Sequence, residues 1–183
     1  ARWAAQTRAV SAFICAQAVS VELGAANASD GLYQRDLFDG LTQPAAVGGR
    51  SGRKAVSNGV APARYIYFLA RQEFQFRTVG PVQAAVDYFD TGSGSFRLEY
   101  DSPDAAYPVD GAYKATDSVP LTDSGQWRTA VFDLPDAYFG DRQNGGADLR
   151  ISLLDMDFYV SGVSITKPQP PCPYALYLPA ARR

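Results

Sequence analysis

The chain has 183 residues, of which 46% are hydrophobic and 20% charged, and its formal net charge is −2 at pH 7. This length and balance predict one folded domain with a single core and exclude a disordered chain. The small net charge and the lack of a long Lys/Arg run argue against a nucleic-acid partner.

Histidine is absent, and the two cysteines are Cys15 and Cys172. Without histidine the chain cannot build a Ser-His-Asp or Cys-His catalytic system or an imidazole site for zinc or copper. Carboxylate chemistry, tyrosine chemistry and calcium bound by oxygen ligands remain. Chain ends are often neighbours in a sandwich, so the cysteines either form a disulfide in an oxidising compartment or remain two unpaired small apolar residues.

The chain divides into a leader at 1–18, a folded domain at 19–167 and a proline-rich tail at 168–183. A basic start, an apolar stretch and the small-x-small run at 26–28 resemble a secretion signal, but we favour a partly helical or extended leader followed by the first strand. We expect the protein to be secreted or extracellular. Alternation over 19–23 instead predicts the first strand of a half-buried sheet. No apolar run reaches the roughly 18–20 residues of a membrane span, and we expect no membrane partner.

Residues 29–63 are rich in Gly, Asp, Asn and Pro, and they predict loops with one or two short strands. The pair Asp39-Gly40 is typical of a turn. Asp39 is also an oxygen donor of the type that calcium takes, so it is either a structural turn residue or a cation ligand.

Strands follow from residue 64 onward, as aromatic and β-branched residues alternate with polar ones. Phe96, Leu98 and Tyr100 share one face of a strand, and Arg97, Glu99 and Asp101 share the other, which predicts a sheet with one wet face. Residues 91–94 predict a hairpin connection. The expected strands are 64–70, 73–79, 82–90, 95–101, 113–119, 126–134, 148–154 and 157–165.

Two segments between the later strands predict reversals of the chain. Residues 135–141 begin with a proline and predict a turn of helix or a compact loop. Asn144-Gly145-Gly146 predicts a hairpin connection, since these residues tolerate positive φ. Short strands, frequent turns and little helix indicate an all-β fold, an antiparallel β-sandwich or jelly roll, with a closed barrel as the alternative.

The segments "VDYFDTGSGSFRLEYDS", "GQWRTAVFDLPDAYFGD" and "DMDFYVSGVSI" resemble carbohydrate-binding modules of the galactose-binding-like jelly-roll superfamily. The resemblance is to families 6 and 35, which accompany bacterial polysaccharide-degrading enzymes, and it covers residues 30–167. It implies a non-catalytic module that binds a polysaccharide or oligosaccharide and targets a linked or neighbouring catalytic domain to it.

The resemblance also implies roles for individual residues. Trp127 stands where related modules place one wall of a sugar cleft, and it is either such a wall or a core anchor. The family's Asn-x-Asp before the last strand appears here as Asp155-Met156-Asp157, so Asp155 replaces the sugar-binding asparagine. Asp157 and Glu22 resemble the family's ligands for a structural calcium ion.

Four further side chains are candidates because they lie in or beside expected loops. Tyr107, Tyr113 and Tyr138 either face a sugar or pack on the edge of the sandwich. Asn144 is a possible hydrogen-bond partner at a loop tip.

Two other functions stay open at this point. One is a protein-interaction or structural sandwich, in which exposed aromatic residues contact another domain. The other is a glycoside hydrolase or lyase, for which carboxylate pairs such as Glu73 with Glu99 can be nominated. Nineteen acidic residues make such a nomination easy, so we expect a binding module rather than an enzyme.

Overall fold

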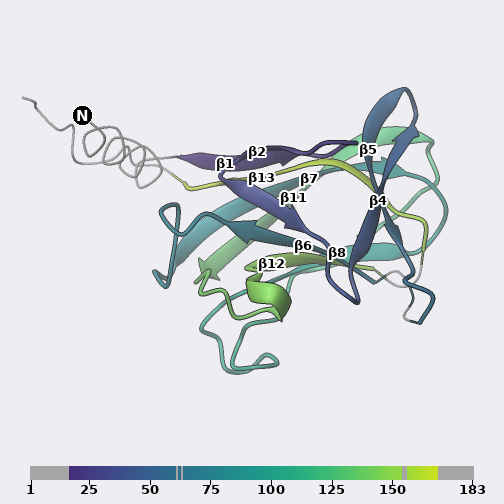
Figure 1. Ribbon diagram of the computed structural model, residues 1–183. Coiled ribbons are helices and arrows are strands. Elements are labelled where there is room, and N and C mark those ends of the chain that lie inside the picture. The colour runs from purple at the N-terminus through teal and green to yellow at the C-terminus, as the bar shows by residue number, and fades with distance from the viewer. Residues whose placement is uncertain (1–16, 61, 63, 154–155, 169–183) are drawn as a thin grey trace, which may run out of the picture.

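The computed structural model describes residues 17–60, 62, 64–153 and 156–168. Asp155, both cysteines, and most of the expected leader and tail therefore lie outside the described residues, and the domain limits stay predictions. Within the described residues, strands form two antiparallel sheets that pack face to face (Figure 1). The predicted sandwich is confirmed. No helix in this part of the chain is long and apolar enough to cross a membrane.

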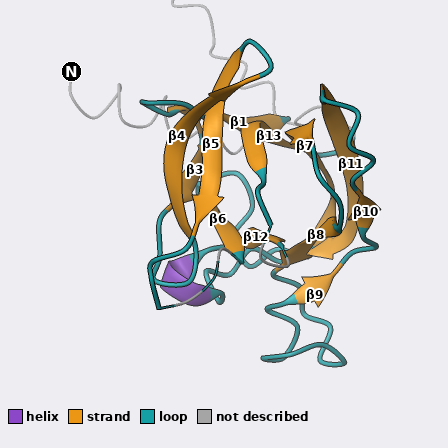
Figure 2. Ribbon diagram, turned by 90° about the vertical axis from the view of Figure 1, so that its right-hand side faces the viewer, coloured by secondary structure: helices purple, strands orange, loops and turns teal. Residues whose placement is uncertain are grey.

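The larger sheet, here called sheet I, follows the strand order β11-β7-β13-β1-β2, with β5 paired to β13 and β4 to β5. Its seven strands are β1 (Ala18–Glu22), β2 (Ala28–Asp30), β4 (Leu41–Val47), β5 (Arg50–Val56), β7 (Gly80–Asp90), β11 (Gln126–Ala137) and β13 (Tyr159–Thr166). Figure 2 shows β1, β13, β7 and β11 as one layer of the sandwich.

The smaller sheet, sheet II, follows the order β10-β8-β12-β6-β3, with β9 paired to β8. Its six strands are β3 (Leu32–Arg35), β6 (Tyr65–Ala70), β8 (Ser95–Tyr100), β9 (Lys114–Ala115), β10 (Val119–Pro120) and β12 (Leu149–Ser152). Figure 2 shows β6, β12 and β8 as the opposite layer.

The core lies between the sheets and is built by alternate residues of the strands. Phe132 and Leu134 of β11 face inward from sheet I, and Phe96, Leu98 and Tyr100 of β8 face inward from sheet II; all five are buried. The expected alternation of β8 is confirmed on its apolar side. Its polar side is wet only at Arg97, however, because Glu99 is 5% exposed and Asp101 is fully buried.

Three predicted connections differ in the structure. Residues 91–94 and 144–146 are not hairpin turns, because each joins a strand of sheet I to a strand of sheet II. Residues 144–146 form a short 3₁₀ helix, with φ of 64° at Gly145 and 74° at Gly146, so the expected positive φ is confirmed. The segment 135–141 is not a helical turn at its start, since β11 continues to Ala137 past an irregularity in its pairing.

The strand predicted at 73–79 is wrong. Phe74 and Gln75 are both buried and Arg77 has a φ of 50°, so the segment is a loop that closes one end of the sandwich. The alternating phenylalanines do not mark a strand, because Phe74 fills the core and Phe76 lies at the loop surface.

Residues 29–63 hold more structure than predicted. They contain most of β2, together with β3, β4 and β5. β4 and β5 form a hairpin with a tight turn at Gly48-Gly49, where both glycines have positive φ, 54° and 74°. Glycines of this kind suit a two-residue hairpin turn, which explains how a stretch so rich in turn residues forms two seven-residue strands.

Candidate functional site

The outer face of sheet II gathers aromatic and charged side chains from three adjacent strands. The strand register places Tyr67 of β6 beside Arg150 of β12, and Arg150 beside Glu99 of β8. One pleat further along, Tyr65 lies beside Ser152. Because side chains alternate between the two faces, these residues all point away from the core.

The guanidinium of Arg150 is held rigidly on this face. Its Nε and Nη2 donate to Glu99 Oε2 at 2.7 and 2.5 Å, and its Nη1 donates to the hydroxyl of Tyr67 at 2.9 Å. Only 11% of the Arg150 side chain and 7% of the Glu99 side chain are exposed. Burial acts to lower the pKa of Arg150, but the charge and hydrogen bonds of Glu99 outweigh it and raise the pKa.

Two tyrosine rings flank this guanidinium. Its carbon lies 3.7 Å from the ring centroid of Tyr65 and 4.2 Å from that of Tyr113, both within the range of a cation–π contact. Tyr113 comes from the loop before β9, which crosses over the sheet. Both tyrosines keep part of their surface in solvent.

Two loops add polar groups at the edge of this arrangement. The Asn144 amide nitrogen lies 3.4 Å from Asp39 Oδ2 and 3.3 Å from the hydroxyl of Tyr67, to which it donates. The backbone N–H of Asn144 donates to the hydroxyl of Tyr113 at 2.9 Å. Tyr67 itself is fully buried, and desolvation raises its pKa to about 12, so it stays a neutral hydrogen-bonding group.

We call Tyr65, Tyr113, Arg150, Asn144 and Asp39 the tyrosine–arginine patch. It combines half-exposed aromatic rings with a fixed guanidinium, an exposed amide and a carboxylate. Such a set can contact the C–H face of a sugar ring and both donate to and accept from its hydroxyls. Phe38, next to Asp39 in the chain, is 70% exposed and adds apolar surface beside the patch.

The patch unites three residues that the sequence had singled out separately: Tyr113, Asn144 and Asp39. Tyr65, Phe38 and Arg150 were not among the predicted site residues. Their signal was the alternation of the strands: Tyr65 and Tyr67 share one face of β6, and Arg150 lies on the polar face of β12. The sequence does not reveal which strands are neighbours.

Trp127 lies elsewhere, on the outer face of sheet I. Its indole N–H donates to the carbonyl of Val47 at 3.0 Å, its ring meets Phe89 edge-on at 5.5 Å, and the Arg50 guanidinium lies 5.1 Å from it. The tip of the β4–β5 hairpin thus covers the ring, which is half-buried. Its surroundings are those of an anchor for the hairpin.

Tyr107 and Tyr138 lie outside the patch as well. Tyr107 contacts Lys114, whose ammonium lies 5.4 Å from its ring and bridges two aspartates. Tyr138 lies under the guanidinium of Arg142 at 5.0 Å. Both rings are half-buried in these contacts.

The predicted metal ligands do not come together. Glu22 pairs with Gly162 across β1 and β13, whereas Asp157 lies five positions before Gly162, roughly 16 Å along an extended strand. Asp157 is also bound by the ammonium of Lys54 at 2.8 Å. Asp39 belongs to the patch on the other sheet. No group of three acidic or sulfur ligands occurs among the described residues, so Glu22, Asp39 and Asp157 do not fit one calcium site, and calcium stays a prediction.

The acidic pair nominated for hydrolysis is engaged in ion pairs. Glu99 is bound by Arg150 and by Arg97, whose Nη2 lies 2.7 Å from Glu99 Oε1. Glu73 accepts from Arg71 at 3.0 Å in the loop after β6. Both carboxylates are held by arginines, so neither is placed as a free acid or base.

No protein-family model matches the sequence, and no curated protein is similar to it. Several solved structures are similar in fold. The CBM22-1 and GH10 modules of endo-1,4-β-D-xylanase 10B from Clostridium thermocellum, solved with xylohexaose, align with 86% of this chain at a TM-score of 0.50 and 14% identity. This chain spans 29% of the length of that xylanase chain.

Two single modules are similar as well. A CBM35 from Paenibacillus barcinonensis aligns with 81% of this chain and 98% of its own, at 13% identity and a TM-score of 0.45. The C-terminal CBM6 of a laminarinase from Zobellia galactanivorans aligns with 82% of this chain and 99% of its own, at 12% identity and a TM-score of 0.43. The chain therefore has the two-sheet fold of carbohydrate-binding modules, as its resemblance to them predicts.

Proposed function

We propose that this chain is a non-catalytic carbohydrate-binding module and that the tyrosine–arginine patch binds a polysaccharide. The observation that carries the proposal is the guanidinium of Arg150, fixed between the rings of Tyr65 and Tyr113 and next to the exposed amide of Asn144. The fold shared with the xylanase modules that were solved with xylohexaose supports it.

Rigidity is what makes the patch suitable. A sugar hydroxyl that loses water must find a partner at hydrogen-bond distance, or its desolvation costs free energy. Groups already held by Glu99 and Tyr67 lose little conformational entropy when a ligand arrives. The patch also carries both donors and acceptors, as the hydroxyls of a sugar require.

The role of such a module is to hold an enzyme near its substrate. We propose that the chain is secreted and is linked to, or lies beside, a catalytic domain that acts on the same polysaccharide. Tethering raises the effective concentration of the enzyme at the polymer without any chemical step in the module.

Affinity electrophoresis and calorimetry against xylan, β-glucan, mannan and pectin test the proposal. The chain is expected to bind at least one of them, and Tyr113→Ala is expected to weaken that binding by tenfold or more, about 1.4 kcal/mol. Tyr33→Ala is the matched control, because Tyr33 is an exposed tyrosine, 40% accessible, on the same sheet but outside the patch. If the chain binds no polysaccharide, or if both variants lose affinity equally, the proposal is wrong.

A further inference from the structure

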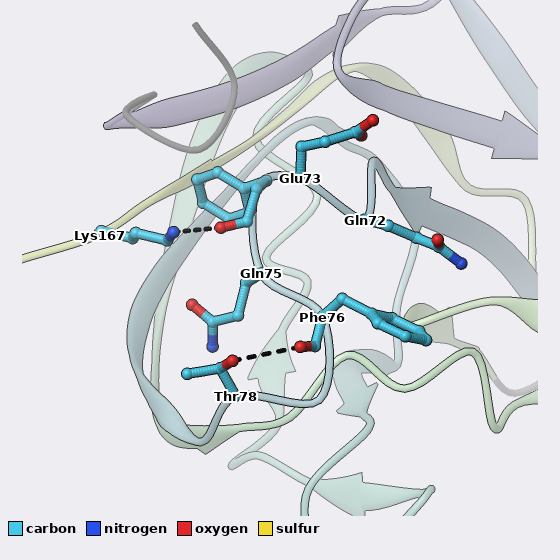
Figure 3. Close-up of a pocket in the computed structure, with 7 residues that line it drawn as sticks. Gln72, Glu73, Gln75, Phe76, Thr78 and Lys167 are labelled. Atoms are coloured by element: carbon cyan, nitrogen blue, oxygen red, sulfur yellow. Dashed lines mark hydrogen bonds between the residues drawn. The ribbon is translucent and has the colours of Figure 1, made fainter. Parts of the chain in front are cut away.

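A pocket of about 450 Å³ opens beside the loop that joins β6 to β7 (Figure 3). None of its lining residues belongs to the tyrosine–arginine patch. Its walls are residues of that loop together with the first residue after β13. The lining residues are Gln72, Glu73, Phe74, Gln75, Phe76, Thr78 and Lys167. The proposed function makes no use of it.

Among the described residues that line this pocket, Lys167 is the one with a positive charge. The side chain is half-buried, its Nζ donates to the carbonyl of Phe74, and it lies 4.3 Å from the Phe74 ring centroid. The backbone N–H of Lys167 donates to the carbonyl of Gln17 at 2.8 Å, which fixes where the side chain begins. Burial lowers the pKa of Lys167, as expected for an ammonium that has lost water without gaining an anion.

Among the residues that the structure describes, no acidic side chain balances this charge. Glu73 is the one acid among the described lining residues, but its carboxylate accepts from Arg71 at 3.0 Å, and Figure 3 shows it turned away from Lys167.

The same wall also offers oxygen acceptors. Gln75 is 8% exposed and its Nε2 donates to the carbonyls of Ala137 at 2.8 Å and Gly80 at 3.3 Å, which leaves its Oε1 for another donor. The hydroxyl of Thr78 donates to the carbonyl of Phe76 at 3.2 Å and keeps its lone pairs. Figure 3 shows Gln75 and Thr78 on the side of the loop that faces Lys167.

We propose that this pocket binds the carboxylate of an acidic sugar, a uronate unit. Lys167 pairs with the carboxylate, and the Gln75 and Thr78 oxygens accept from neighbouring hydroxyls. A partly desolvated ammonium without a counter-ion gains most from such a ligand, because attraction between opposite charges strengthens as water is removed. The choice of a sugar acid rests on the proposed function; the site is separate from the patch.

Calorimetric titration of the full chain with sodium glucuronate tests the inference, with glucose and sodium acetate as parallel ligands. We expect glucuronate to bind with an affinity that falls as salt increases, and glucose and acetate to bind at least tenfold more weakly. Lys167→Met is expected to reduce glucuronate affinity at least tenfold, and Lys167→Arg to retain it. Lys54→Met is the matched control, since Lys54 already pairs with Asp157.

Three results would overturn the inference: no glucuronate binding by the wild type, acetate binding as strong as glucuronate binding, or glucuronate binding unchanged in Lys167→Met. Circular dichroism on each variant confirms that the fold persists, and the arginine variant keeps the test valid if the methionine variant unfolds. Polysaccharide binding that depends on Tyr113 but is unaccompanied by glucuronate binding would refute this site alone. If the wild-type chain binds none of the polysaccharides, the proposed function itself is refuted.

Discussion

The two outer faces of the sandwich each hold aromatic rings beside an arginine, but they use them differently. On sheet II, Arg150 is fixed by Glu99 and Tyr67, and the tyrosine rings beside it keep surface in solvent. On sheet I, the guanidinium of Arg50 lies over Trp127 at the turn of a hairpin and donates to Ser161 at 3.2 Å. The two faces therefore use the same residue types for different purposes. Arg150 is held rigidly beside rings that stay in contact with solvent, whereas the β4–β5 hairpin covers the ring of Trp127.

The largest effect is expected from Glu99→Gln. This change leaves the buried guanidinium of Arg150 without its counter-ion, and breaking a buried pair in this way typically costs about 3–5 kcal/mol. Urea unfolding measures the loss. Arg97→Gln is the control, because its side chain is 45% exposed and its pair with Glu99 should contribute less than about 1 kcal/mol. Equal losses in the two variants would contradict the idea that Glu99 chiefly supports Arg150.

Trp127→Ala and Tyr113→Ala should behave oppositely. Because Trp127 anchors the hairpin, its removal is expected to lower the free energy of unfolding by about 2 kcal/mol and to change polysaccharide affinity less than twofold. Tyr113→Ala should mainly lower the affinity. Paired urea unfolding and calorimetry on both variants decide the matter. A loss of affinity in Trp127→Ala that equals that in Tyr113→Ala would move the sugar site toward sheet I.

Two buried aspartates, one at the end of a strand of sheet I and one just before a strand of sheet II, differ in their pKa shifts. Asp90, the last residue of β7, accepts from Thr122 and Ser124; burial acts to raise its pKa, but these hydrogen bonds outweigh it and lower the pKa. Asp148, just before β12, accepts only backbone N–H groups, from Ala70 and Asp141. Burial, together with the charges of Asp141 and Asp101, raises the pKa of Asp148 to about 7.

The pKa of Asp90 is lowered and that of Asp148 is raised, so the two carboxyl groups make stability depend on pH in opposite directions. Asp90 contributes stability that is present above its unfolded pKa and is lost as the pH falls through its folded pKa. Asp148 contributes stability that is complete below its unfolded pKa, near 3.8, and is lost as the pH rises toward 7. We expect the free energy of unfolding to fall by about 1–4 kcal/mol between pH 4 and pH 7 through Asp148. In Asp148→Asn this part of the pH dependence should vanish, whatever the variant's absolute stability.

The sequence predicted the sandwich because most long strands carry a clear period of two. β8 and β12 lie within the ranges that alternation indicated, whereas β7 begins at Gly80, before the expected 82–90, and β13 ends at Thr166, just past the expected 157–165. The β4–β5 hairpin was missed because its turn residues dominate the composition, and 73–79 was mistaken for a strand because two phenylalanines alternate there. Loop residues such as Tyr113 and Asn144 could be named singly, but their convergence on Arg150 depends on the order of strands in the sheet, which local patterns do not encode.

The smallest effect concerns the hairpin over Trp127. A Cβ on Gly48 would come within 2.5 Å of the Phe89 ring and 3.1 Å of the Trp127 indole nitrogen, whereas a Cβ on Gly49 would meet nothing within 4 Å. Both glycines have positive φ, so Gly49→Ala should cost only the backbone strain of about 1 kcal/mol. Gly48→Ala should cost more, because the hairpin must also lift from the ring. Thermal unfolding of the two variants measures the difference, and equal costs would show that the hairpin tip does not press on Trp127. Polysaccharide affinity should stay unchanged in both, because sugar binding on sheet II does not depend on the cap of sheet I.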